Sequence, residues 1–253
     1  MHKQASEIAQ AEPHLRQLVN YCVLQHSNFE TALVFRLASR LGSAELGAEQ
    51  LIEVFGDALS ADQAIAFAAK SDLLAIVERD PACHRLVDPF LFSKGWQAVQ
   101  SYRIAHHFWN QGRKDLAYFI QSQTSLISSV DIHPAARIGN GIMLDHGHDV
   151  VIGETCVIED NVSIMQGVTL GGTGKEIGDR QPKIRQGVLI GVGAKILGNI
   201  EIGRGSRIAA GSVVLHPVPP NTTVAGIPAK VVGASGSQEP ARSMDHQIEV
   251  DDG

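Results

Sequence analysis

Residues 190–214 read IGVGAKILGNIEIGRGSRIAAGSVV, and every sixth position of this stretch is aliphatic. The repeating positions are Ile190, Ile196, Ile202, Ile208 and Val214. This period is neither the 3.6-residue period of an amphipathic helix nor the two-residue period of a half-buried strand. It is typical of a parallel β-helix, in which one short strand and one turn take six residues and three such units close a triangular coil.

The repeat begins much earlier in the chain. A second series consists of Ile152, Ile158, Ile164 and Leu170. An earlier trio, two residues out of phase, consists of Ile132, Ile138 and Leu144. Of the 25 glycines, 19 lie between Gly139 and Gly236, whereas the aromatic residues all lie at or before Phe119. Glycine suits tight corners, and a narrow prism excludes aromatic rings. We therefore predict a left-handed parallel β-helix over residues 130–233.

Residues 1–129 show the spacing of amphipathic helices, which makes the fold class α + β with an N-terminal helical bundle. Residues 27–30 have the capping-box spacing, and the apolar positions after them recur at intervals of three and four until Gly42. Residues 60–63 repeat this start before a run that Asp80-Pro81 breaks, and a third run covers residues 91–110. We interpret this half as an oligomerisation domain, and its aromatic stripe as core or subunit contact.

Two segments depart from the repeat. Between Gly171 and Gln186 the sequence GGTGKEIGDRQPKIRQ keeps no aliphatic residue in phase with the series that ends at Leu170, and we predict a projecting loop over residues 171–186. A loop of this size on a regular coil is usually functional, although a solvated excursion is the alternative. Its cations are Lys175, Arg180, Lys183 and Arg185. Residues 234–253 are small, polar and acidic, so we predict a flexible tail there.

The composition excludes several classes of function. The chain has 253 residues, 44% of them hydrophobic, and a formal net charge of -6. An acidic chain lacks the excess of cations that binding to nucleic acid or an anionic membrane requires, so neither is an expected partner. No apolar run is long enough to span a membrane and no cleavable signal is visible, which predicts a soluble cytoplasmic protein. The cysteines are far apart and predict reduced thiols.

Ionisable residues gather in the early coils. They are Asp131, His133, Asp145, His146, His148 and Asp149. A coil takes about eighteen residues, so a residue about fifteen positions after Asp131 is expected near it on the adjacent turn. His146 meets this condition. A carboxylate that accepts a hydrogen bond from one imidazole nitrogen leaves the other nitrogen free as a base near neutral pH. The alternative is an ordinary surface pair.

A metal site is a competing interpretation of the same segment. His146-Gly147-His148 places two imidazoles on one strand face, an arrangement that is compatible with zinc. Cys156 occupies a packing position of the repeat and contributes no ligand. We therefore expect no metal.

Seven longer motifs extend the pattern. They are RDPA and SYRIAHHFWNQGR in the first half and VDIHPAARIGNGIMLDH, GVTLGGTGK, DRQPKI, GAKILGNIEIGRGSRIAAGSVV and AGIPAKVV in the second. As a set they resemble bacterial serine O-acetyltransferase over nearly the whole chain, whereas the hexapeptide repeat alone indicates only an acyltransferase-like protein. The resemblance implies acetyl transfer from acetyl-coenzyme A (acetyl-CoA) to the hydroxyl of L-serine. The products are O-acetyl-L-serine and CoA, in the first step of cysteine biosynthesis.

The resemblance also implies roles for single residues. His146 matches the catalytic base of the family, and Asp131 matches the carboxylate that orients it. Asp80 and Asp145 match carboxylates near the amino acid, where their charge suits an ammonium group. Arg180 matches the residue that faces the substrate carboxylate, for which a guanidinium fork is well shaped.

Gln181 departs from the family pattern, which is DRHPK where this sequence reads DRQPK. A substrate-contacting histidine is expected at this position. Glutamine donates a hydrogen bond to a carboxylate but carries no charge. We predict weaker feedback inhibition by L-cysteine than in relatives with histidine, and a different small hydroxy or amino acceptor stays open as an alternative.

Five residues are implied in cofactor binding. They are Gly172, Val192 and Ala210 along the pantetheine arm, and Arg207 and Lys230 near the phosphates of acetyl-CoA. Solvated surface explains the basic pair equally well. Because the groove for the arm lies between neighbouring prisms in this fold, the resemblance implies at least a homotrimer. Pairing of the helical halves in the family implies a dimer of trimers.

The tail bears on a further partner. In the family it ends in isoleucine, which inserts into the active site of O-acetylserine sulfhydrylase. This sequence stops at Gly253 without a terminal isoleucine, so the interaction is expected to be absent or weak unless the sequence is truncated. A hypothesis of another class is a non-catalytic β-helix that serves as an assembly or regulatory subunit. Thiol release from acetyl-CoA in the presence of an amino acid distinguishes the enzyme from this scaffold.

Overall fold

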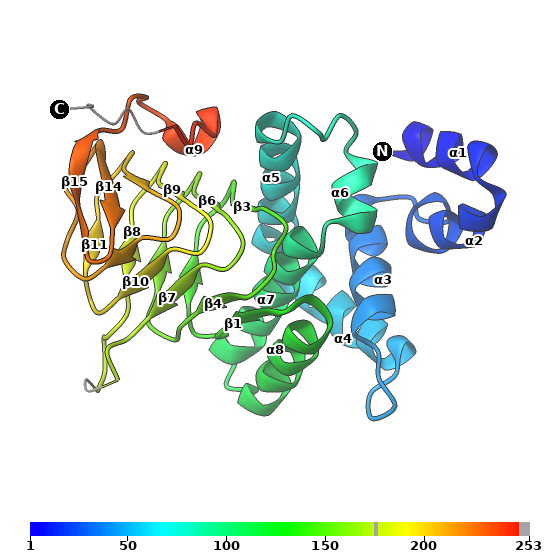
Figure 1. The fold of residues 1–253 in the computed structure, drawn as a ribbon. Helices are drawn as coiled ribbons and strands as arrows, with labels where there is room; N and C mark the ends of the chain where they lie inside the picture. Colours follow the sequence, from blue (N-terminus) through cyan, green and yellow to red (C-terminus); the bar gives the residue numbers. More distant parts are fainter. Residues whose placement is uncertain (175–176, 248–253) are drawn as a thin grey trace.

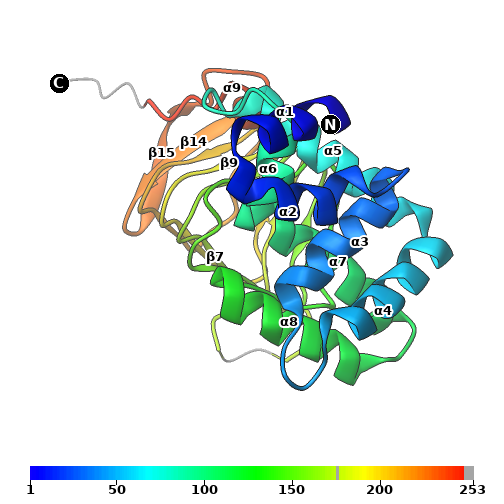
Figure 2. The ribbon, with the colours of Figure 1, turned by 90° about the vertical axis from the view of Figure 1, so that its right-hand side faces the viewer.

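The computed structural model describes residues 1–174 and 177–247. Helices and strands occupy separate parts of the molecule, with the helices at the N-terminal end and a stack of short strands at the other (Figure 1, Figure 2). The helices of the first part are α1 His2–Ala11, α2 Arg16–Val19, α3 Phe29–Leu41, α4 Ala48–Ala61, α5 Gln63–Arg79, α6 Val87–Phe92, α7 Lys94–Asn110 and α8 Lys114–Ser128. A 3-10 turn over Pro13–Leu15 precedes α2, and a π-helical turn over Asn20–Leu24 follows it.

Side-chain caps decide where the helices begin, and they differ from the predicted starts. The N-cap of α3 is Asn28, whose Oδ1 accepts a hydrogen bond from Thr31 N at 2.8 Å. Ser60 lies inside α4, and the N-cap of α5 is Asp62, whose Oδ1 accepts from Ala64 N at 3.0 Å. Ser93 divides the third predicted run into α6 and α7 because its Oγ accepts from Trp96 N at 3.3 Å. In each case a short polar side chain satisfies a backbone N–H that the first helical turn leaves without a partner.

The strands form three sheets, which we call faces A, B and C. Face A has the order β1-β4-β7-β10-β13, face B has β2-β5-β8-β11, and face C has β3-β6-β9-β12-β14-β15. The strands are β1 Val130–Ile132, β2 Arg137–Ile138, β3 Met143–Leu144, β4 Val150–Ile152, β5 Val157–Ile158, β6 Ser163–Ile164, β7 Thr169–Gly171, β8 Lys183–Ile184, β9 Leu189–Ile190, β10 Lys195–Leu197, β11 Glu201–Ile202, β12 Arg207–Ile208, β13 Val213–Val214, β14 Thr222–Gly226 and β15 Ala229–Ala234. Neighbouring strands are parallel except β14 and β15, which confirms the predicted parallel β-helix.

The register locates the phase shift after the early trio and the interruption at residues 171–186. On face A, Ile132 pairs with Ile152, Ile152 with Leu170, and Leu170 with Ile196. By subtraction these coils span 20, 18 and 26 residues. The two extra residues of the first coil lie between β3 and β4, and the eight extra residues of the third lie between β7 and β8. The phase shift of the early trio therefore marks a lengthened turn at residues 145–149, and the interruption at residues 171–186 marks the projecting loop.

Buried aliphatic residues fill the prism, and α7 and α8 close its N-terminal end. Ile164, Ile190 and Ile196 are at most 1% exposed. Tyr102 of α7 packs into the core of the β-helix and its hydroxyl donates a hydrogen bond to Ala136 O. The predicted aromatic stripe of Trp96, Tyr102 and Phe108 is buried, as expected for a core, and so are Phe55 and Phe90. Tyr21, Phe67, Phe92 and Tyr118 are exposed. The last helical residue of α8 is Ser128, and β1 begins at Val130.

Part of segment 235–247 contacts the prism, and the flexibility predicted for residues 234–253 stays a prediction. Helix α9, Pro240–Ser243, lies beside the strands of face C (Figure 1). Ala241 is 1% exposed and its carbonyl oxygen accepts a hydrogen bond from Ser163 Oγ at 2.7 Å. Composition does not reveal such contacts, because they join residues that are far apart in the sequence. Residues 248–253, and with them the prediction about Gly253, lie outside the described residues.

No helix in the described part of the chain is both long and apolar enough to cross a membrane.

Candidate active site

The turns that lead from face C to face A form one edge of the prism, which we call edge CA. Hydrogen bonds join successive turns along it, from Gly167 N to His148 O at 2.7 Å, from Gly193 N to Gln166 O at 2.9 Å and from Gly211 N to Val192 O at 2.7 Å. The first of these turns carries His146, and later turns carry Val192 and Ala210. The candidate base and two candidate cofactor residues therefore lie along one edge.

The turn that carries His146 has a left-handed backbone. His146 has a φ of 53° and Gly147 a φ of 55°. Asp145 Oδ1 accepts a hydrogen bond from His146 N at 2.9 Å, which supports this conformation. A residue other than glycine in this region is often found at functional sites, where the surrounding structure holds it. The imidazole is 71% exposed and is therefore accessible to a ligand.

Helix α7 lies directly against the His146 turn. A Cβ atom on Gly95 would collide with Leu144 O, and a Cβ atom on Gly147 would lie 2.5 Å from Gly95 Cα. The two glycines thus allow the backbones of the helix and the turn to touch. The helical half therefore helps to determine where His146 lies.

Asp80 and Asp145 line the same cavity, of about 210 Å³, between the helical half and the β-helix. Asp80 follows α5, where its Oδ1 accepts a hydrogen bond from Ala82 N at 2.8 Å, and Asp145 follows β3. The two carboxylates predicted near the amino acid are thus brought together, next to His146. The sequence reasoning missed Asp88 and Cys83, which also line this cavity. Both follow Asp80 within eight residues, but no motif that we quoted includes them.

The turns from face A to face B form a second edge, edge AB, which carries the projecting loop. Figure 1 shows the described part of the loop standing away from the coils. Arg180 Nη2 donates to Glu154 Oε2 at 2.7 Å, and this guanidinium lowers the pKa of Glu154 below its ordinary value. Glu154 was missed in the sequence, because its partner is 26 residues away. Lys183 and Arg185 pair with Asp179 and Glu159, whereas Lys175 lies outside the described residues.

Gln181 is only 7% exposed, and its side-chain oxygen is already occupied. Oε1 accepts hydrogen bonds from Thr155 N and Thr155 Oγ1, both at 2.6 Å. The side chain lies over Gly153, where a Cβ atom would come within 2.4 Å of Gln181 Nε2 and 3.1 Å of Gln181 Cγ. Within the described residues Nε2 makes no hydrogen bond, so the amide nitrogen is the group left to meet a ligand.

Asp131 and His146 do not make the contact that their spacing predicts. Asp131 is the middle residue of β1 on face A, and its partner one coil further is Val151. Its Oδ1 accepts a hydrogen bond from Gln121 Nε2 at 2.6 Å, whereas His146 Nε2 lies 3.6 Å from Asp145 Oδ2. The expectation fails within one chain because a residue fifteen positions further lies at the next edge and not above Asp131.

The other candidate cofactor residues lie away from edge CA. Gly172 is on edge AB, on the opposite side of face A from Val192 and Ala210. Arg207 of β12 is buried; its Nε donates to Thr223 Oγ1 at 3.2 Å and its Nη1 donates to Asp245 O at 3.0 Å. Lys230 is exposed on β15. One chain therefore does not bring the five residues together.

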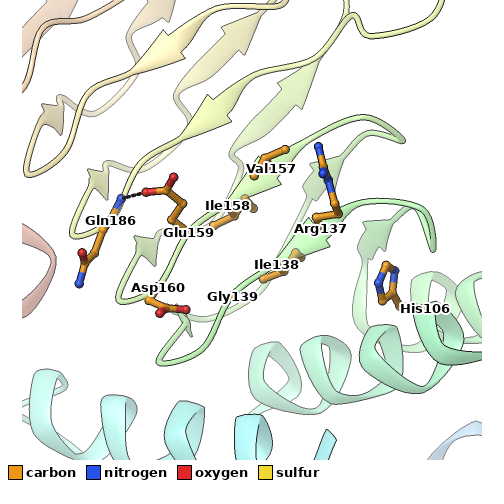
Figure 3. A pocket seen from close by; sticks show the side chains of 9 residues that line it. All are labelled: His106, Arg137, Ile138, Gly139, Val157, Ile158, Glu159, Asp160 and Gln186. Carbon is orange, nitrogen blue, oxygen red and sulfur yellow. Dashed lines mark hydrogen bonds between the residues drawn. The ribbon is translucent and has the colours of Figure 1, made fainter. Parts of the chain in front are cut away.

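Face B has a shallow cavity of about 440 Å³, and none of the candidate residues lines it. Figure 3 shows residues of the paired strands β2 and β5 that line it, with His106 of α7 at one end and Gln186 at the other. Glu159 accepts a hydrogen bond there from Gln186 N at 3.0 Å. In residues 1–174 and 177–247, no group of three or more His, Cys, Asp or Glu side chains is placed to hold a metal ion. His148, one of the imidazoles considered for zinc, lies 3.1 Å from Lys94 Nζ.

Comparison with known proteins indicates the class of this chain and shows its family. Residues 181–216 match the family described as bacterial transferase hexapeptide (six repeats), which agrees with the coils and indicates the class of hexapeptide-repeat transferases. Residues 1–101 match the family described as serine acetyltransferase, N-terminal. A serine acetyltransferase of Salmonella typhimurium is 52% identical over 257 residues, which cover 99% of this chain and 94% of the relative. The chain belongs to the serine acetyltransferase family.

Two solved structures share the fold over nearly the whole chain. A serine acetyltransferase in complex with cysteine has a TM-score of 0.96 and 48% identity, covering 98% of this chain and 96% of its own. The Brucella abortus serine acetyltransferase in complex with coenzyme A has a TM-score of 0.91 and 51% identity, covering 92% and 93%. Similarity of this extent assigns the chain serine O-acetyltransferase activity, and not the role of a non-catalytic scaffold.

Proposed function

We propose that the chain acetylates L-serine from acetyl-CoA at a site where His146 is the general base and Asp80 and Asp145 bind the substrate ammonium. The products are O-acetyl-L-serine and CoA, in the first step of cysteine biosynthesis. The observation that carries the proposal is the cavity shared by Asp80 and Asp145, which adjoins the exposed imidazole of His146. Two carboxylates from different walls of one small cavity favour a cationic group there.

The site is completed by a second subunit. His146, Asp145, Val192 and Ala210 lie on edge CA, whereas Arg180 and Gln181 lie on edge AB, on the other side of face A. A neighbouring prism that places its edge AB against this edge CA brings both halves together. It also brings the partner's Asp131 toward the imidazole of His146, so that the proposed dyad forms between two subunits. A cyclic trimer makes three such junctions, because each heterologous contact repeats around the axis. Pairing of two trimers through the helical halves belongs to the same proposal.

The residues divide the chemistry among them. His146 Nε2 takes the proton of the serine hydroxyl as the hydroxyl oxygen bonds to the thioester carbon. The carbon–sulfur bond then breaks, and the imidazolium returns the proton to the departing thiolate, so the base is regenerated. Arg180, held by Glu154, faces the substrate carboxylate as a charged fork. Asp131 orients the imidazole and stabilises its charged form.

Acetyl-CoA lies along edge CA in this proposal. The pantetheine arm follows the turns of Val192 and Ala210, while Gly172 of the adjoining edge AB lines the other wall. Arg207 and Lys230 are the cations for the phosphates. Since the Arg207 guanidinium also donates to Asp245 O at 3.0 Å, the C-terminal segment contacts one of these cations.

L-Cysteine is proposed to bind the same amino-acid site, because it carries the same ammonium and carboxylate groups as serine. A relative was solved in complex with cysteine. Binding of O-acetylserine sulfhydrylase stays a prediction, since the residues that bear on it lie beyond residue 247.

The test is CoA thiol release by the wild-type chain with serine, homoserine, threonine and diaminopropionate, each with and without cysteine. Serine is expected to give the highest kcat/KM. Higher kcat/KM with another member of the panel would instead support the alternative acceptor that Gln181 raises. Absence of thiol release with all four would contradict the proposal.

A further inference from the structure

Asp72 is a fully buried carboxylate at the junction of the helical half and the β-helix. It lies in the middle of α5, and its Oδ2 accepts hydrogen bonds from Arg103 Nη2 at 2.7 Å, Arg103 Nε at 3.1 Å and Gln100 Nε2 at 3.0 Å. Its Oδ1 accepts from Ile142 N at 2.8 Å. One side chain thus joins α5, α7 and the backbone that leads into β3.

Arg103 extends the same network to the first coil. The guanidinium is 8% exposed and donates to Gly139 O at 2.7 Å and to Ile138 O at 3.3 Å. A buried ion pair contributes little net stability over apolar residues of the same shape, because desolvation offsets the attraction. Such a pair can instead specify one arrangement of the elements it joins. Here the contacts with Ile138, Gly139 and Ile142 fix the position of α5 and α7 against the first coil.

Asp72 and Ile142, which a hydrogen bond joins, each precede a chain segment that leads to the cavity lined by Asp80 and Asp145. Along α5, Ile76 lines the cavity one turn after Asp72, and Asp80 follows one turn later. Along the β-helix, Met143 and Leu144 line it directly after Ile142, and Asp145 follows. The hydrogen bond from Ile142 N to Asp72 is therefore a cross-link between the two walls that carry Asp80 and Asp145.

We infer that Asp72 is a positioning residue for the acceptor. It sets the separation of Asp80 and Asp145, and through them the affinity for the ammonium group of serine, without touching the substrate. The inference rests on the proposed role of this cavity. A change at Asp72, two helical turns before Asp80, should therefore alter the affinity for the amino acid and not the affinity for acetyl-CoA.

The test separates position from stability with two variants. Asp72→Asn with Arg103 intact leaves a buried guanidinium without its counterion and destabilises the fold. Asp72→Leu combined with Arg103→Met replaces the pair by apolar residues of similar size, which removes the uncompensated charge but leaves Ile142 N without its acceptor. For the double variant we expect a thermal midpoint between those of Asp72→Asn and the wild type, because the uncompensated charge is gone but Ile142 N and Gln100 Nε2 lose their acceptor. Its KM for serine should rise about 10- to 100-fold, because a misplacement near 1 Å can cost that much. Its KM for acetyl-CoA should change less than about threefold, because the proposed cofactor residues Val192 and Ala210 lie on later turns than the one that follows β3.

The matched control is Phe55→Leu, a core change in α4 that lines neither the cavity nor β3. It should lower the thermal midpoint and leave the KM for serine unchanged. A wild-type KM for serine in the double variant would overturn the inference, as would a rise in KM that follows the thermal midpoint across all variants. A crystal structure of the double variant adds a second measurement, since the Asp80–Asp145 separation should change. If the wild type itself releases no thiol with serine, the proposed function fails, and the crystallographic separation still tests the positioning.

Discussion

At the scale of single residues, Gln181 occupies the position where the family resemblance predicts a histidine. Its amide oxygen is held by Thr155 and its carbon atoms lie over Gly153, so the orientation of the amide is set before any ligand binds. The nitrogen that remains is an uncharged donor. A hydrogen bond from a charged donor to a carboxylate is stronger than one from a neutral donor.

Gln181→His is therefore expected to strengthen inhibition by cysteine. The gain should be about fivefold in the inhibition constant at pH 6, where a histidine is largely protonated, and smaller at pH 8. The measurement is the inhibition constant for cysteine at both pH values, with the wild type as the control. An unchanged constant at pH 6 would show that residue 181 does not contact the inhibitor.

At the scale of elements, the lengthened turn at residues 145–149 and helix α7 act as one unit. The hexapeptide repeat alone would leave no room for two extra residues on edge CA, and α7 supplies the surface against which they fold. The glycine pair Gly95 and Gly147 permits this contact. His146 is thus placed by a helix that precedes it by some forty residues in the chain, a relation that no local pattern contains.

Gly95→Ala is expected to displace the His146 turn, because the new methyl group would collide with Leu144 O. We expect kcat to fall about 100-fold while the helix content by circular dichroism is retained. Gly56→Ala is the matched control, since a Cβ atom at Gly56 meets nothing within 4 Å and the residue lies inside α4. This control should be as active as the wild type and about 0.5–1 kcal/mol more stable. Equal kcat in both variants would show that α7 does not position His146.

At the scale of the whole molecule, the two candidate half-sites lie on different edges of one prism. This separation predicts that activity requires contact between subunits, and the proposal can be tested by mixing two inactive chains. His146→Ala removes the base from edge CA, with an expected loss of about 100- to 10,000-fold, and Arg180→Ala removes the cation from edge AB.

Trimers assembled from an equal mixture of the two variants are expected to regain about a quarter of the wild-type activity. The fraction follows because an intact site needs edge CA from one variant and edge AB from the other, each with a chance of one half. The measurement is thiol release after the mixture is unfolded and refolded together, and each variant refolded alone is the control. No recovery in the mixture would place both half-sites within one chain.

The sequence by itself determined the coil, its two interruptions and the kinds of side chain at the site. A six-residue period states directly which residues point inward, because each short strand repeats the same inward position. Both interruptions lie at edges of the prism, since extra residues can only leave it there, and both carry residues of the proposed site.

Only the tertiary structure decided which of these residues meet. Asp131 and His146 are close in the sequence but lie on face A and at edge CA, because the register sets Asp131 beside Val151. Asp80 and Asp145 are far apart in the sequence but share a cavity, because buried contacts such as those of Asp72 dock the helices on the first coil. The six-residue repeat predicts which side chains of each coil point inward. The docking of distant segments depends instead on their shape and on specific hydrogen bonds, which the repeat does not predict.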